Sequence, residues 1–288
     1  MLSVPGGRLW YRVVGSGPGT PLLVIHGGPG GVSCVENELG RLGIDRPVIF
    51  YDQLGTGHSE RPADSSYWNL AHFVSEVDAI RQQLGLRELH LFGHSWGGAV
   101  AAEYVLTHGT EGVRSLILAA PLLSTPKWLE DAKVLVAQLP PEQQQAIAAG
   151  ETTGRYDDSA YRAANDTFSA RYFSRSGAAA HYAECRTSPK GNRAMYNAMW
   201  GPSEFSSTGT LRNYDRSTRL HELRLPVLLI GGQYDEARPD RLREYQQSIL
   251  GARVAIIPDA GHMMMADKPE LTLAALRTFL REVEQTNR

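Results

Sequence analysis

The segment LHLFGHSWGGAVAAEYVL, from Leu89 to Leu106, sets three glycines around one serine directly after a short apolar run. The run before the serine is typical of a buried strand, and the residues after it have the spacing of a helix that is apolar on most faces. A chain that turns this sharply needs glycines, because side chains would collide with the turn. The segment therefore predicts a strand, a tight turn and a helix, with Ser95 at the apex.

The first half of the chain repeats this alternation of short apolar runs and helical patterns. Further strand-like runs are PLLVIHG, PVIFYDQ and VRSLILAAP, and NLAHFVSEVDAIRQQLG has helical spacing that stops at Gly85. Such alternation is typical of a parallel sheet with helices on both faces. We therefore predict an α/β chain built on a mostly parallel, doubly wound sheet.

The alternation stops after Pro121, where helical patterns follow one another without strands. These patterns are TPKWLEDAKVLVAQLP, PPEQQQAIAAG, DSAYRAANDTFSARYF and KGNRAMYNAMW. We expect Thr125 and Pro126 to form the N-cap and the first turn of the first helix. The block therefore predicts a helical insertion in the sheet.

Strand-like runs return after the insertion, at PVLLIGGQYD and RVAIIPDAGH, and a helical pattern, KPELTLAALRTFLREVEQ, closes the chain. The sequence thus predicts a discontinuous core, residues 1–121 and 216–288, and a helical cap, residues 122–215. We expect the cap at the carboxyl ends of the strands, where sheets of this kind bind ligands.

The composition argues against several classes of protein. The net charge is −2 at pH 7, so we expect neither nucleic acid nor an anionic membrane as a partner. No apolar run approaches the roughly 18 residues that span a bilayer, and the first residues lack the pattern of a secretory leader. Cys34 and Cys185 have no metal-ligand spacing and are expected to be inert thiols in a reducing compartment. Together these features predict a cytoplasmic protein.

Gly93 to Gly97, GHSWG, fit the G-x-S-x-G turn that presents a nucleophilic serine. A serine needs a general base, and the base needs an acid that orients it. Asp235 and His262 each follow a predicted strand, in the chain order that this architecture uses, so we expect them at the same sheet edge as Ser95. Asp259 is the alternative acid, but it lies so close to His262 that it belongs to the same loop.

The loop HGGPGG, His26 to Gly31, follows the first predicted parallel strand and exposes backbone N–H groups. We expect the N–H groups of Gly28 and Trp96 to form an oxyanion hole. A phosphate cradle is the competing interpretation, but the loop lacks both Gly-Lys-Ser/Thr and the dinucleotide spacing. His26 is expected to be structural, because it precedes the glycines and a better base exists.

Five segments together resemble one family: HGGPGG, YDQLGTGHS, GHSWGG, GGQYDEARP and AGHMMM. They are similar, over nearly the whole chain, to the proline iminopeptidase branch of the α/β-hydrolase fold. The resemblance implies Ser95, Asp235 and His262 as the catalytic triad. It also implies that two carboxylates bind the free amine of the substrate, Glu236 beside the acid and Glu204 in the GPSEF segment of the cap. It implies neither a metal nor a cofactor.

Three residues depart from the commoner pattern of this family: Leu54 stands where arginine is common, Thr56 where many members have cysteine, and His94 where many have glycine or serine. These three differences do not affect the expected chemistry, but they leave undetermined which substrate side chain the protein prefers.

We predict a serine hydrolase that cleaves an N-terminal amino acid, proline or a small or apolar residue, from peptides or amides through an acyl-enzyme. An amino-acid amidase or carboxylesterase of the same fold, without a requirement for a free amine, is the alternative. A ligand-binding homologue without activity is a remote one, against which the intact triad argues. The oligomeric state and the final acyl acceptor stay open.

Overall fold

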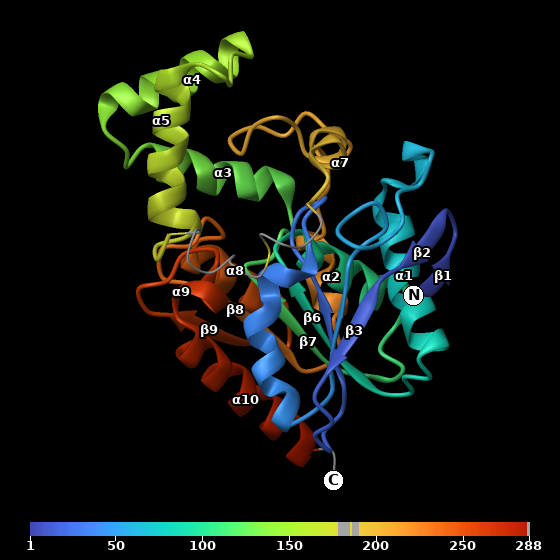
Figure 1. Ribbon diagram of the computed structural model, residues 1–288. Helices are drawn as coiled ribbons and strands as arrows, with labels where there is room; N and C mark the ends of the chain where they lie inside the picture. The colour runs from blue at the N-terminus through green and yellow to red at the C-terminus, as the bar shows by residue number, and fades with distance from the viewer. Residues whose placement is uncertain (178–184, 186–189, 287–288) are drawn as a thin grey trace.

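The computed structural model describes residues 1–177, 185 and 190–286. Within them, seven strands form the central sheet in the order β3-β5-β4-β6-β7-β8-β9 (Figure 1). β3 runs antiparallel to β5, and the other neighbouring pairs of this sheet are parallel. The predicted α/β class with a mostly parallel sheet is confirmed. The strands are β3 Tyr11–Val14, β4 Leu22–Ile25, β5 Val48–Tyr51, β6 Leu89–His94, β7 Val113–Ala119, β8 Val227–Gly232 and β9 Arg253–Ile257.

The N-terminal strands were not predicted from the sequence. β1 (Leu2–Val4) and β2 (Gly7–Leu9) pair antiparallel as a small separate sheet, and β3 forms one edge of the large one. None of the three is buried along its whole length, whereas every residue of β4, β5 and β6 is buried. Only a strand covered on both faces reads as a continuous apolar run.

Helices cover the sheet as the alternation predicts. α1 spans Leu70–Gln83, begins at an Asn69 cap and ends two residues before Gly85. It packs against α2, Trp96–His108, while the C-terminal helix α10, Pro269–Thr286, packs against the helical segment η1, Ser33–Ile44 (Figure 1). Two further helices follow the last strands: α8, Pro239–Ser248, follows β8, and α9, Met264–Asp267, follows β9.

Between β7 and β8 the described residues form helices and loops, and no named strand lies among them. The last helical segment, η5 (Ser217–Glu222), leads into β8. The others are α3 Thr125–Val136, α4 Pro141–Thr153, α5 Ser159–Phe168, a π-helical turn Ser169–Phe173 and α7 Arg193–Met199. The two ends of the stretch meet in a β-bridge between Ser124 and Asp215. In Figure 1 these helices stand together at one end of the sheet.

The first of these helices begins one residue earlier than expected. Ser124, not Thr125, is the N-cap of α3, and its hydroxyl oxygen accepts the N–H of Lys127 at 3.4 Å. The Thr125 hydroxyl instead donates to the carbonyl oxygen of Leu211 at 2.8 Å. Serine and threonine are adjacent here and both are good caps, so the sequence alone does not separate them.

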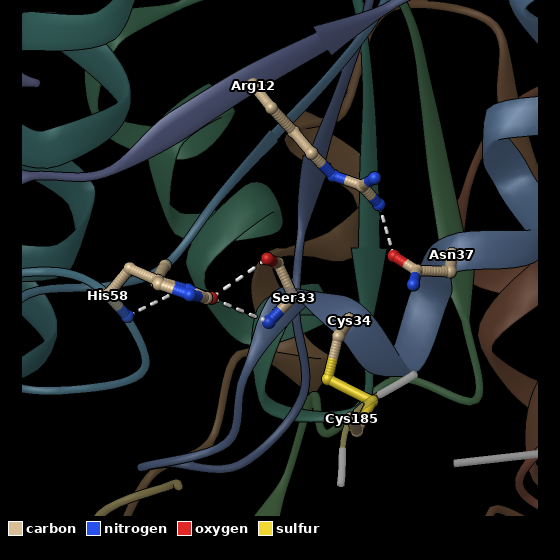
Figure 2. The surroundings of a disulfide bond; sticks show 7 residues. Arg12, Ser33, Cys34, Asn37, His58 and Cys185 are labelled. Carbon is tan, nitrogen blue, oxygen red and sulfur yellow. Dashed lines mark hydrogen bonds and ion pairs between the residues drawn. A yellow bond between two sulfur atoms is a disulfide. The ribbon is translucent and has the colours of Figure 1, made fainter. Parts of the chain in front are cut away.

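Cys34 and Cys185 form a disulfide, and the prediction of two inert thiols is wrong (Figure 2). Their Cα atoms lie 5.6 Å apart although 151 residues separate them in the chain. The pairing joins η1 to the inserted stretch, so no local pattern announces it. Disulfides persist mainly in oxidising compartments, so the pair removes one ground for expecting a cytoplasmic protein. Among the described residues, none of the helices has the length and apolar character needed to cross a bilayer.

Thiol titration in denaturant checks this bond. Protein unfolded without reductant should show no free thiol, and Cys34→Ser should lower the free energy of unfolding by about 2–5 kcal/mol. Cys185→Ser should give the same loss, and the double variant no further loss, because each single change already removes the cross-link. Two titratable thiols in the unreduced wild type would contradict the assignment.

Candidate active site

Ser95 stands at the sharp turn that the sequence predicts, between the end of β6 and the start of α2. Its backbone has φ 55° and ψ −119°, a strained conformation for a residue with a side chain. A Cβ on Gly93 would lie 2.2 Å from the carbonyl oxygen of Gly97, and a Cβ on Gly97 would lie 2.1 Å from that of Ile25. Glycine is therefore required at both positions, and the turn lifts Ser95 to the edge of the sheet.

Asp235 and His262 meet at the same edge, although 26 residues lie between them in the chain. His262 Nδ1 lies 2.9 Å from Asp235 Oδ1, and both side chains are almost fully buried. Backbone N–H groups of Gly232 and Ala237 donate to the two Asp235 oxygens at 3.2 and 2.8 Å, which fixes the carboxylate. The alternative acid, Asp259, is exposed and pairs with Lys268 at 2.8 Å instead.

The ring of His262 is enclosed by aromatic side chains. Phe173 stacks on it with 5.4 Å between centroids, and Trp128 meets it edge-on at 5.7 Å. The backbone N–H of His262 donates to the Tyr172 carbonyl oxygen at 2.8 Å, so the inserted stretch also holds the loop. Burial lowers the pKa of His262, and the charge of Asp235 opposes that effect in part.

The glycine loop lies beside Ser95, and Gly27, Gly28 and Gly31 all line one pocket with it. The N–H of Gly27 donates to Glu36 at 3.4 Å. Trp96 is the first residue of α2, a position whose backbone N–H has no acceptor within its helix. The assignment of Gly28 and Trp96 as the oxyanion donors stays a prediction.

His26 is buried behind the glycine loop rather than in the pocket. Its Nε2 accepts the N–H of Gln53 at 3.1 Å, and its Nδ1 lies 2.7 Å from the carbonyl oxygen of Gly27. Both ring nitrogens are therefore engaged by backbone groups, which agrees with the structural role expected for it.

The pocket has a volume of about 240 Å³ and draws its walls from both parts of the chain. The core contributes Ser95, His262 and Glu236, and the inserted stretch contributes Glu204. Most other walls are apolar, and they come from Val32, Val35, Leu122, Trp128, Phe173 and Trp200. A compact apolar group with one cationic end fits such a space.

The two glutamates are the charged groups that the resemblance singled out. Tyr196 donates its hydroxyl hydrogen to Glu204, and burial raises the pKa of that carboxyl. Glu236 is 6 % exposed, and its pKa is raised well above its ordinary value by burial first and then by the charges of Glu204 and Asp235. Two carboxylates that line one pocket favour a cationic ligand. A cation offsets both the loss of their hydration and the repulsion between their charges.

Sequence reasoning missed several residues around the pocket. The aromatic walls, the Tyr196 hydroxyl and a buried Glu36 carry no motif that would identify them. Gln53 belongs to the YDQ segment, but that motif does not indicate its contact: its side-chain oxygen accepts the indole N–H of Trp96 at 2.9 Å. No group of three or more possible metal ligands was found within the described residues.

The chain is similar to several known proteins. A family model described as alpha/beta hydrolase fold matches residues 20–269. A proline iminopeptidase from Heyndrickxia coagulans is 39% identical over 283 residues, which cover 98% of each chain. The crystal structure of a Mycobacterium smegmatis proline iminopeptidase superposes with a TM-score of 0.90 at 30% identity, covering 100% of this chain and 99% of that one. An esterase from a Rhodococcus species shares the fold, with a TM-score of 0.66 at 21% identity, covering 98% of each chain.

The acid side of the pH profile tests the burial of His262. Only the neutral imidazole accepts a proton, so turnover of a short acyl ester should fall as the pH drops through the pKa of His262. Burial lowers that pKa, so the midpoint should lie below about 6.5, the ordinary value for histidine. Asp259→Asn is the control and should leave the midpoint unchanged. A midpoint above pH 7 would contradict the predicted effect of burial.

Proposed function

The chain belongs to the proline iminopeptidase family of the α/β-hydrolase fold, and on that premise we propose that it removes an N-terminal proline from peptides through an acyl-enzyme. The observation that carries this proposal is the pocket that Ser95 and His262 line together with two carboxylates, the buried Glu236 and the half-buried Glu204. A small or apolar N-terminal residue other than proline, or an amide in place of a peptide, fits the same chemistry.

The proposed reaction begins when Ser95 attacks the carbonyl carbon of the first residue. His262 takes the hydroxyl proton, while Asp235 holds the imidazole in the required tautomer and stabilises its charged form. The N–H groups of Gly28 and Trp96 donate to the developing oxyanion. The C–N bond then breaks, and His262 returns the proton to the leaving amine. Water, activated by His262, hydrolyses the acyl-Ser95 ester.

Glu204 and Glu236 bind the ammonium group of the substrate in this proposal. An ammonium that enters a closed pocket loses its water, and charged partners replace that hydration. The pKa values of both carboxyls are raised because the charged forms are unfavourable in the pocket when no cation is bound. Only the first residue of a peptide carries an α-ammonium, so this pairing restricts cleavage to the terminal bond.

We assign the two parts of the chain different tasks. The core, residues 1–121 and 216–288, supplies the triad, the oxyanion donors and Glu236. The cap, residues 122–215, supplies Glu204 and the aromatic rings of Trp128, Phe173 and Trp200. Location in the cytoplasm stays a prediction, and the disulfide argues against it.

An amino-acid amidase or esterase that ignores the amine is the second candidate. Such an enzyme needs the triad and the oxyanion hole, which carry the acyl chemistry by themselves. It has no use for two carboxylates in the same pocket as the nucleophile, and removing them from water is costly. The arrangement therefore favours the aminopeptidase.

Ser95→Ala should abolish turnover, with a loss on the order of 10⁶-fold in kcat. The alanine removes the attacking oxygen and leaves the rest of the pocket intact. A fluorophosphonate should label the wild type at Ser95 and leave the variant unlabelled. Labelling that persists in Ser95→Ala would place the nucleophile elsewhere.

Glu204→Gln should impair cleavage of a free prolyl anilide and leave a short acyl ester nearly untouched. Removing one partner of a desolvated ion pair costs about 2–5 kcal/mol, which is roughly 30-fold to several-thousand-fold in kcat/KM. Glu236→Gln should act in the same direction, but its neighbour Asp235 orients His262, so it is the less clean variant.

Glu130→Gln is the matched control for that measurement. Glu130 lies on α3 in the same inserted stretch, is 64% exposed and pairs with Arg241 at the surface. Its removal should change neither substrate. If Glu204→Gln leaves anilide and ester kinetics equally unchanged, the aminopeptidase proposal loses its main support and the esterase takes its place.

A further inference from the structure

His94, the residue before the nucleophile, has an acceptor at each ring nitrogen. Its Nδ1 lies 3.1 Å from Glu36 Oε1, and its Nε2 lies 3.2 Å from the backbone carbonyl oxygen of His262. A neutral imidazole has one N–H and donates only one hydrogen bond. As a neutral ring His94 thus donates to one of the two oxygens, and as an imidazolium it donates to both.

Glu36 extends this connection to the glycine loop. It is fully buried on η1, and the same oxygen that meets His94 accepts the N–H of Gly27 at 3.4 Å. Its other oxygen has no hydrogen-bond partner within the described part of the chain, although it is buried. A buried carboxylate oxygen without a hydrogen bond destabilises the fold, so the presence of Glu36 here needs an explanation other than packing.

We propose that Glu36 and His94 form a positioning unit that fixes the glycine loop and the His262 loop relative to Ser95. Hydrogen bonds run from Gly27 through Glu36 and His94 to the carbonyl group of His262. His94 is bonded directly to Ser95, so one chain of contacts joins the glycine loop, the nucleophile and the base. The rings of His94 and His262, 4.8 Å apart, also pack against each other.

This unit acts on the reaction rather than on substrate binding. Glu36 and His94 also line the pocket, but no hydrogen bond found among the described residues joins them to Glu204 or Glu236, so we expect their loss to affect the reaction more than binding of the amine. The distance between base and nucleophile does depend on this unit, and errors of about 1 Å in such distances cost on the order of 10²-fold in rate. The inference rests on the proposed acyl chemistry but not on the aminopeptidase assignment.

The same strand offers a matched control at its opposite end. His90, near the start of β6, is also buried beside a glutamate, with its Nε2 3.5 Å from Glu284. Its Nδ1 lies 2.7 Å from the hydroxyl of Ser115, which donates or accepts as needed. His90 lies outside the pocket, so its loss should affect stability alone.

The test measures kcat per active site, counted by fluorophosphonate labelling, for His94→Asn, His94→Phe and His90→Phe. A short acyl ester serves as the substrate, since its turnover needs only the triad and the oxyanion hole. Both His94 variants should lose roughly 10- to 100-fold in kcat, with KM changed less than about 3-fold. His90→Phe should lower Tm and keep kcat per labelled site. Values of kcat within about 2-fold of wild type in both His94 variants would overturn the proposal.

A double-variant cycle tests whether the two residues act as one unit. The amide that Glu36→Gln introduces is neutral, so its hydrogen bonds to Gly27 and His94 are weaker than those of the charged carboxylate. Glu36→Gln should therefore lower kcat by about 10-fold, and the combination with His94→Asn should cost no more than His94→Asn alone. Fully additive losses would show two independent effects. If the wild type hydrolyses the ester but not a prolyl anilide, the proposed substrate is wrong while this test still stands.

Discussion

The turn at Ser95 forms because two glycines let backbone segments approach more closely than any side chain allows. Gly97 brings α2 against the end of β4, and Gly93 brings the end of β6 against the first turn of that helix. Since parallel strands all end at the same edge, the loops after β8 and β9 then deliver Asp235 and His262 beside the serine. The chemistry of the pocket is thus a consequence of sheet geometry more than of any single side chain.

The parts of the fold that the sequence predicted are those with a local physical cause. β4, β5 and β6 are buried throughout, so each appears as a continuous apolar run. Asp235 could be preferred over Asp259 because Asp259 precedes His262 by only three residues and so belongs to the same loop. The edge strand β3 has a mixed pattern and escaped notice, since one short, half-exposed segment resembles many loops.

What the sequence did not predict depends on contacts between distant segments. Cys34 and Cys185 pair across 151 residues, and two cysteines at that spacing look the same whether or not they meet. Glu36 lies in no motif, and its meaning appears only when η1 brings it to His94. A motif reflects the local requirements of the backbone. A buried pair of charged or polar side chains from distant segments can be identified only in the folded structure.

The β-bridge between Ser124 and Asp215 holds the two ends of the inserted stretch together at its base. Changes in the length of that stretch between β7 and β8 therefore need not move the strands that position Ser95, Asp235 and His262. Such remodelling would move Glu204, which lies in the stretch, but not Glu236, which adjoins Asp235 in the core. If both bind the substrate ammonium as proposed, a descendant that lost this specificity would retain Glu236 after Glu204 had gone.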